Sequence, residues 1–226
     1  MPRKSAYFRK DNRLAQAQKM LRRVERIHTL HQFPFSPSQA ALLLLDLQAI
    51  FFDPSSHAYL PASEAILPAL VEVAQAFKRI DRPIILTQHI NTLADARLMS
   101  RWWHNLITAT HPLAEIHPEF MPFAQHLIRK SQYDAFYNTS LEEQLRQFGI
   151  TQVLIGGVMT HLCCETTARC AFQRGFAVFF LVDGTATYNE FYHQATLLNL
   201  TQGFASPIFC NQVIATCNLL KETKDP

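Results

Sequence analysis

The sequence predicts an α/β domain with a doubly wound, mostly parallel sheet. Short apolar runs, each typical of a buried strand, recur at 40–46, 83–87, 153–155 and 177–182. Segments with helical patterns separate them, and no internal repeat or low-complexity tract interrupts the alternation. Parallel strands covered by helices on both faces are apolar almost throughout. Right-handed crossovers between them give a three-layer, Rossmann-type sheet, here preceded by an N-terminal helical extension.

Composition fits one folded domain with a full core. The chain has 226 residues, of which 48% are hydrophobic, and no apolar run is long enough to cross a bilayer. Its first ten residues are basic and lack the apolar core of a signal peptide. Five cysteines, an odd number without framework spacing, suit free thiols in a reducing compartment. We therefore expect a cytoplasmic protein without a membrane partner.

Residues 1–36 are predicted to be a basic helical extension and linker, and residues 37–226 to be the enzyme domain. The extension holds nine lysines and arginines against Asp11 and Glu25. A basic arm can bind nucleic acid or anionic lipid. However, apolar residues recur at helical spacing over about 12–29, which favours a helix packed on the domain or on a second subunit. We therefore expect no nucleic-acid partner.

The first half of the domain contributes two strands and an irregular segment. A strand at 40–46 ends in Asp46, and a helix follows at 63–80, in which Pro68 is expected to cause a kink. The next strand occupies 83–87. Residues 92–120 are irregular and aromatic, with a short helix at 94–103, which is typical of the wall or lid of a pocket.

The second half repeats the alternation. A strand at 126–130 ends in Lys130, and Thr139 is predicted to cap a helix at 140–148 through a capping box with Glu142. The strand at 153–155 is predicted to end in a Gly156–Gly157 turn, and Thr160 to cap the helix that follows. The remaining elements are a strand at 177–182 that ends in an acid, a helix at 190–201, an edge strand at 207–209 and a helix at 212–221.

Three of these strands deliver Asp46, Lys130 and Cys163 to one edge of the sheet. Open α/β sheets bind ligands at the carboxyl ends of their strands. Cys163 falls in the first turn of a helix, where free amide groups and the helix dipole favour a thiolate. A carboxylate can take the thiol proton, an ammonium can stabilise the thiolate, and the turn before the helix can supply oxyanion donors. Taken singly, a cysteine in such a helix is more often a buried packing residue than a nucleophile. Asp46 taken singly is equally compatible with a functional acid and with a solvated loop acid or helix cap.

The chain resembles the isochorismatase-like cysteine hydrolases, a family that includes nicotinamidases, N-carbamoylsarcosine amidases, ureidoacrylate-type amidohydrolases and true isochorismatases. The resemblance covers about 36–215 and leaves the basic arm unaccounted for. It rests on the blocks LLLLDLQ at 42–48, KSQYDAFYNTSLEEQL at 130–145, GGVMTHLCCETTARCAFQRGF at 156–176, LVDGTAT at 181–187 and EFYHQATLLNL at 190–200.

By position, the resemblance implies that Asp46 is the general base, Lys130 the catalytic lysine and Cys163 the nucleophile. It further implies a cis peptide between Val158 and Met159, with the backbone amides of Met159 and Cys163 facing the oxyanion. The other four cysteines are expected to be packing residues. A homo-oligomer is also implied.

The chain departs from two branches of this family. It lacks the Asp-x-His pair of the nicotinamidase metal site, so we expect no metal and no other cofactor, and we expect nicotinamidase activity less than other amide hydrolysis. The segment 87–106 is more like the isochorismatase branch, in which glycine usually replaces the cysteine. Because this chain has Cys163, we expect C–N hydrolysis of a small-molecule substrate. The expected pocket residues are Phe51, Gln88, Trp102, Trp103, Tyr133 and His161.

Three functions remain open at this point. The first is a cysteine amidohydrolase acting on a small amide, ureide or carbamoyl compound through a covalent acyl-enzyme. The second is an isochorismatase-type vinyl-ether hydrolase, which needs acid catalysis by Asp46 but no thiol. The third is a non-catalytic binding or interaction module in which the basic arm recruits a partner.

Overall fold

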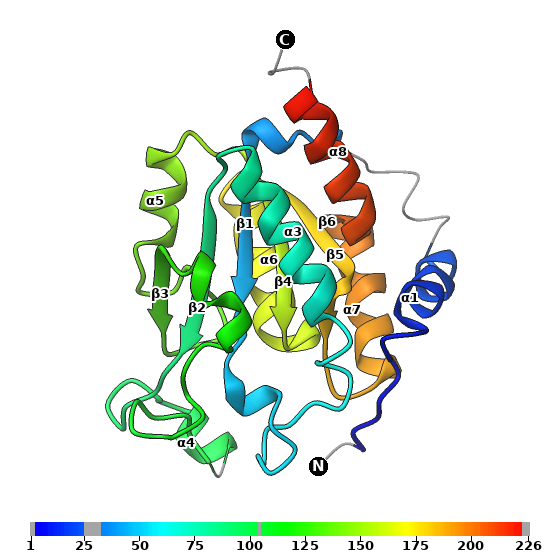
Figure 1. Cartoon of the computed structure of the whole chain (residues 1–226). Coiled ribbons are helices and arrows are strands. Elements are labelled where there is room, and N and C mark those ends of the chain that lie inside the picture. Colours follow the sequence, from blue (N-terminus) through cyan, green and yellow to red (C-terminus); the bar gives the residue numbers. More distant parts are fainter. Residues whose placement is uncertain (1–2, 25–32, 104, 223–226) are drawn as a thin grey trace.

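The computed structural model describes residues 3–24, 33–103 and 105–222. Within them the core is one parallel sheet of six strands in the order β3-β2-β1-β4-β5-β6 (Figure 1). This arrangement confirms the predicted fold class. The strands are β1 (Ala40–Leu45), β2 (Ile84–His89), β3 (His126–Lys130), β4 (Gln152–Val158), β5 (Ala177–Ala186) and β6 (Ala205–Ile208).

The strand order places a crevice at the middle of the sheet. The chain runs outward from β1 through β2 to β3, and then returns to place β4 on the other side of β1. All six residues of β1 are buried, and its register pairs Leu44 with Leu86 on one side and with Gly156 on the other. Ligand sites in open α/β sheets form where the winding direction reverses, beyond the carboxyl ends of the strands. Here that point lies between β1 and β4.

Helices cover both faces of the sheet. In Figure 1, α3 and α8 pack together in front of the strands, and α6 lies behind them. The helices are α1 (Arg13–Arg22), α3 (Leu67–Arg79), α4 (Met99–Trp102), α5 (Leu141–Gln147), α6 (Glu165–Gln173), α7 (Glu190–Gly203) and α8 (Cys210–Glu222). Shorter helical turns occupy η1 (Pro37–Gln39), η2 (Ala49–Phe51), η3 (Pro118–Phe123) and the π-helical turn η4 (Thr160–Cys164). None of the helices within these residues is both long enough and apolar enough to span a bilayer.

Three predictions about helix ends are wrong. Pro68 lies in the first turn of α3, where its missing N–H costs nothing, so it starts the helix instead of kinking it. The N-cap residue of α5 is Ser140, which makes no side-chain cap bond. The Thr139 hydroxyl lies one residue before the N-cap, where it accepts from the backbone N–H of Leu141 at 3.3 Å and donates to the carbonyl of Ala135. The short helix expected at 94–103 is confined to α4.

The central strand β4 also differs from prediction. It continues through the two glycines to Val158 instead of turning at Gly156. Gly157 has φ +115°, and a Cβ there would lie 2.1 Å from the carbonyl oxygen of Leu45. The second glycine therefore allows β4 to lie against the end of β1. The helical region after it begins at Thr160, and its N-cap residue is Met159, which makes no side-chain cap bond, so Thr160 is not the N-cap. The Val158–Met159 peptide is cis, as the resemblance implied.

The N-terminal segment packs on the domain. Phe8 is buried, and α1 contributes Ala17 and Met20 to the main core. Arg13 forms an ion pair with Asp183, which lies inside β5 and not at its end as predicted. The predicted helix extends to 29, but α1 ends at Arg22, and residues 25–32 lie outside the described part of the chain. The division of the chain after residue 36 stays a prediction.

Candidate active site

A cavity of about 110 Å³ lies at the carboxyl ends of β1, β2 and β4. These ends point toward the loops that carry α4, at the bottom of Figure 1. Asp46 and Cys163 lie at its base, and most of its wall is aromatic or aliphatic. The lining residues are Asp46, Phe51, His57, Ala58, His89, Asn91, Met99, Trp103, Asn105, Leu106, Ile107, Tyr133, Met159, Leu162, Cys163 and Tyr188.

Asp46 is held by the neighbouring strand. It follows β1 directly, is fully buried, and has φ +52°, a left-handed conformation that aspartate tolerates better than most residues. The hydroxyl of Thr87 on β2 donates to Oδ1 of Asp46 at 2.6 Å and accepts from its backbone N–H at 3.1 Å. The second carboxylate oxygen is thereby directed toward Lys130.

Lys130, the last residue of β3, supplies the cation of the site. Its Nζ lies 2.8 Å from Oδ2 of Asp46 and 3.4 Å from Sγ of Cys163, and it donates to the carbonyl of Gln132 at 3.0 Å. Burial alone would lower the pKa of Lys130, but the carboxylate of Asp46 raises it above its usual value. Burial would likewise raise the pKa of Asp46, and the ammonium holds it below its usual value. The two groups are therefore a buried ion pair at neutral pH.

Cys163 lies in the π-helical turn η4 and is buried. Burial raises its thiol pKa to about 12; the nearby Asp46 carboxylate adds to this effect and Lys130 opposes it. The expectation that the helix start and the ammonium would favour a thiolate is therefore wrong for the resting site. One ammonium balances only one anion, and Asp46 is the stronger acid. At rest the proton is therefore expected on the sulfur of Cys163 and not on the carboxylate of Asp46.

His89, at the end of β2, completes the cluster. Its Nδ1 lies 3.4 Å from Nζ of Lys130, and its Nε2 lies 2.9 Å from Oδ1 of Asn91. Since the ammonium can only donate and Oδ1 can only accept, the ring carries its proton on Nε2. Burial, followed by the neighbouring Lys130, lowers the pKa of His89 to about 4, so the ring is neutral.

The same atoms are the cluster most suited to a metal among the described residues. One ligand atom each from Asp46, His89 and Cys163 lie within 4.8 Å of one another. Nζ of Lys130, however, contacts all three of these side chains. A divalent ion would have to displace a charged ammonium that already neutralises the carboxylate. The ligand atoms of Asp46, His89 and Cys163 are therefore better suited to binding the Lys130 ammonium than a metal ion. The expectation that the protein needs no metal stays a prediction.

The structure separates the predicted pocket residues into two groups. Phe51, Trp103 and Tyr133 line the cavity, and the indole N–H of Trp103 donates to the Tyr133 hydroxyl at 2.7 Å. Gln88, Trp102 and His161 do not line it.

Each of these three side chains has another environment. Gln88 is buried and donates to the carbonyl of Ala114, Trp102 is 77% exposed on α4, and the ring of His161 is hydrogen-bonded to the hydroxyl of Thr187. Met159 and Cys163 line the cavity, and the role of their backbone amides as oxyanion donors stays a prediction.

Several wall residues were missed by sequence reasoning. His57, Asn91, Asn105 and Tyr188 line the cavity but come from connecting segments that carry no periodic pattern. His89 also lines the cavity and is not among the pocket residues expected from the sequence. Its position at the end of an apolar strand, like that of Asp46, was the signal that would have placed it in the site.

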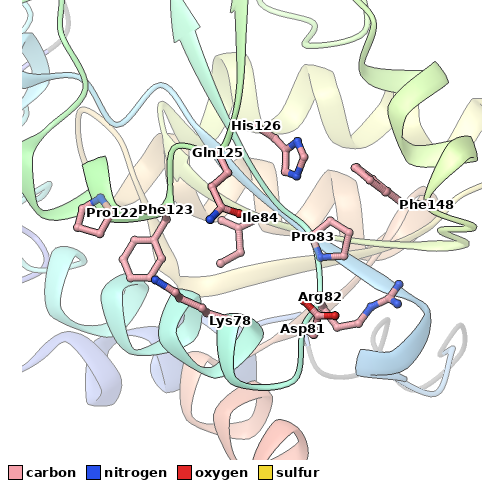
Figure 2. A pocket seen from close by; sticks show the side chains of 10 residues that line it. All are labelled: Lys78, Asp81, Arg82, Pro83, Ile84, Pro122, Phe123, Gln125, His126 and Phe148. Carbon is pink, nitrogen blue, oxygen red and sulfur yellow. The ribbon is translucent and has the colours of Figure 1, made fainter.

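A second cavity, of about 310 Å³, lies at the opposite end of the sheet. Figure 2 shows its lining, which comes from the end of α3, the starts of β2 and β3, the end of η3 and Phe148. It contains Lys78, Arg82 and His126, with Asp81 as its acid, and none of its lining residues is a cysteine. Although larger, it lacks a nucleophile, so we assign the chemistry to the smaller cavity.

Comparison with known proteins agrees with this geometry. The Isochorismatase domain family matches residues 40–212. Nicotinamidase 3 of Arabidopsis thaliana is 37% identical over 180 residues, which cover 77% of this chain and 86% of the relative. A cysteine hydrolase from Pseudomonas syringae pv. phaseolicola has a TM-score of 0.78 at 22% identity, covering 83% of this chain and 96% of its own.

A pyrazinamidase of Pyrococcus horikoshii in complex with zinc shares the fold as well. Its TM-score is 0.68 at 24% identity, covering 76% of this chain and 99% of its own. The family match extends over most of the chain, and the strand ends that carry Asp46, Lys130 and Cys163 lie inside it. The chain therefore belongs to the isochorismatase-like family and is a hydrolase.

Proposed function

We propose that this hydrolase cleaves the C–N bond of a small neutral amide, ureide or carbamoyl compound through an acyl intermediate on Cys163. The observation that carries the proposal is the buried contact of Lys130 with both Asp46 and Cys163, at the base of a small cavity. The name of the Arabidopsis relative, a nicotinamidase at 37% identity, supports amide hydrolysis. Nicotinamide is therefore the first amide to test as a substrate.

The first half-reaction transfers the acyl group to sulfur. As Sγ of Cys163 forms a bond to the substrate carbonyl carbon, the thiol proton moves to the Asp46 carboxylate. The carbonyl oxygen becomes an oxyanion, for which the backbone amides of Met159 and Cys163 are the proposed donors. The C–N bond then breaks, and the leaving nitrogen takes the proton back from Asp46. A thioester and a free amine or ammonia result.

The second half-reaction restores the thiol. Water attacks the thioester carbon while Asp46 takes one of its protons. The C–S bond breaks, the sulfur recovers the proton from Asp46, and the carboxylic product leaves. Throughout, Lys130 remains an ammonium that orients Asp46 and offsets the negative charge, so the net charge of the cluster changes little.

The charge of the cavity favours a neutral substrate. Its wall is largely aromatic and aliphatic, and among the described lining residues the carboxylate is Asp46, with no lysine or arginine. A dianion such as isochorismate would bring two carboxylates into this cavity without a cation to receive them. The flat walls formed by Phe51, Trp103 and Tyr133 suit a small planar molecule instead.

The test is turnover across a panel of small amides, headed by nicotinamide, together with isochorismate. Cys163→Ala should lose at least about a thousandfold in kcat/KM on the active amide. The matched control is Cys170→Ala, which replaces a half-buried cysteine on α6 and should retain activity. A mass increase on Cys163 equal to the acyl group, seen after a rapid quench, would establish the covalent step.

Two results would contradict the proposal. Full activity of Cys163→Ala on isochorismate, lost in Asp46→Ala, would make the protein a vinyl-ether hydrolase. No turnover on any compound would favour the non-catalytic alternative, in which the arm recruits a partner.

A further inference from the structure

The N-terminal arm lies against the candidate active site. The family match begins at residue 40, and residues 3–8 precede it by more than thirty residues. Nevertheless, this segment contacts two separate parts of the cavity wall. One wall segment carries His57 and Ala58 and lies between η2 and α3, and the other carries Tyr188 and lies between β5 and α7.

Lys4 contacts both wall segments. Its Nζ donates to the carbonyl of His57 at 2.9 Å and to the carbonyl of Tyr59 at 2.8 Å. The same ammonium lies 5.5 Å from the centre of the Tyr188 ring, within the range of a cation–π contact. Hydrogen bonds from a charged donor are roughly twice as strong as neutral ones. A single side chain therefore joins two cavity walls that are about 130 residues apart in sequence.

The backbone around Lys4 is fixed to the second wall. The N–H of Ser5 donates to the carbonyl of Tyr188 at 2.8 Å, and the side-chain amide of Asn189 donates to the carbonyl of Arg3 at 2.8 Å. Lys4 therefore extends from a stationary base toward the first wall. The position of that base is set independently of the two carbonyls that Lys4 contacts.

A separate anchor holds the arm to the core. The hydroxyl of Tyr7 accepts from the backbone N–H of Thr187 at 3.1 Å and lies 2.8 Å from Nδ1 of His193, and Phe8 is buried. These contacts hold the arm in place without Lys4. Removing the Lys4 ammonium should therefore release the first wall while the arm stays bound.

We propose that Lys4 is a positioning residue of the substrate cavity. By binding both the 57–59 segment and Tyr188, it holds the two walls together and so sets the width of the cavity entrance. Its kinetic consequence rests on the proposed amide hydrolysis, whereas its effect on access to Cys163 does not. Lys4 touches no reacting atom, and it acts through the wall that the substrate contacts.

The test compares Lys4→Met, which keeps the stem and loses the donors, with two controls. Lys10→Met makes the same change at an exposed lysine on the same arm, and Lys4→Arg restores a donor cation. The first readout is the alkylation rate of Cys163 by a bulky maleimide divided by its rate with iodoacetamide, both measured at pH 9 by peptide mass spectrometry. The second is the separation of KM from kcat on the active amide.

In Lys4→Met we expect the bulky-to-small ratio to rise about tenfold, because losing hydrogen bonds from a charged donor makes local opening about that much more frequent. KM should rise by a similar factor while kcat changes less than about threefold, and Lys4→Arg should restore both values.

If the alkylation ratio and the KM of Lys4→Met match those of Lys10→Met, the proposed positioning role of Lys4 is wrong. If no amide is turned over by the unmodified protein, the proposed function fails, but the alkylation ratio still tests whether Lys4 positions the cavity wall. A lower unfolding midpoint with an unchanged ratio would mean that Lys4 serves only the fold.

Discussion

Replacing Asp46 with asparagine should abolish turnover and at the same time make Cys163 a stronger acid. Loss of a general base is usually expected to leave its nucleophile less reactive. In this site the carboxylate is one of the causes, after burial, of the raised thiol pKa of about 12. The substitution removes that negative charge and leaves the Lys130 ammonium, 3.4 Å from Sγ, without its partner. Both changes favour the thiolate.

The size of the shift follows from the geometry. Asp46 and Cys163 each place a ligand atom within 4.8 Å of the other. Two unit charges no farther apart than this interact by at least about 3 kcal/mol at an effective dielectric constant of about 20, which corresponds to at least about two pKa units. We therefore expect the pKa of Cys163 to fall by at least about two units in Asp46→Asn.

The assay is the pH dependence of alkylation under pseudo-first-order conditions, with each cysteine followed by peptide mass spectrometry. Cys170, whose pKa is raised to about 11 mainly by partial burial, provides an internal reference within the same molecule. In Asp46→Asn the alkylation profile of Cys163 should move to lower pH while that of Cys170 stays in place. Amide turnover should fall at least about a thousandfold.

If the alkylation profile of Cys163 in Asp46→Asn stays at the same pH or moves to higher pH, the electrostatic reasoning is refuted. So would fast alkylation of Cys163 near pH 7 in the unmodified protein, because it would show that the resting proton lies on Asp46 and not on sulfur. A loss of the far-ultraviolet circular dichroism spectrum in Asp46→Asn would move the comparison to Asp46→Ser, which also removes the charge.

Three further predictions concern the frame of the site. Lys130→Met should leave a buried carboxylate unpaired and lower the free energy of unfolding by about 3–5 kcal/mol in urea titrations; Arg129→Met, exposed on the same strand, should cost under about 1 kcal/mol. Gly157→Ala should prevent a stable fold, because its Cβ would overlap the end of β1, whereas Gly203→Ala, with nothing within 4 Å, should leave the unfolding midpoint nearly unchanged. Burial lowers the pKa of His193 to about 3, so the unfolded chain binds a proton that the native chain does not, and stability should fall as the pH drops from 6.5 toward 3. His193→Gln should flatten that decline, and an equally steep decline in the variant would exclude this residue as its cause.

The three reactive residues could be placed from the sequence because each ends or follows a recognisable strand. Asp46 comes directly after an unbroken apolar run, and Lys130 closes a strand whose predicted bounds match the structure. Parallel topology then brings the carboxyl ends of these strands to one edge. The fold class follows from the same alternation, without any knowledge of side-chain contacts.

The cavity wall could not be derived in the same way. Asn105 and Tyr188 lie in connecting segments, where neither a period of two nor a period of 3.6 restricts the direction of a side chain. Trp102 and Trp103 illustrate the difficulty: the two are adjacent, yet Trp103 lines the cavity and Trp102 is 77% exposed. Which of the two side chains lines the cavity depends on where α4 ends, and the bounds predicted for that helix were wrong.

The charge state of the thiol could not be predicted from the sequence, and the reason bears on the chemistry. The helix start and the ammonium of Lys130 do not act on Cys163 alone, because the same ammonium lies 2.8 Å from the carboxylate of Asp46. The cluster holds one cation and can carry one anion without an uncompensated buried charge. That anion is Asp46 at rest, and Cys163 once the proton has moved. Both states have the same net charge, so the proton moves within the cluster and no exchange with solvent is required. A site of this kind needs no group that titrates near neutrality, and its rate of acyl transfer should therefore vary little with pH over the range in which Lys130 stays charged and Asp46 stays ionised.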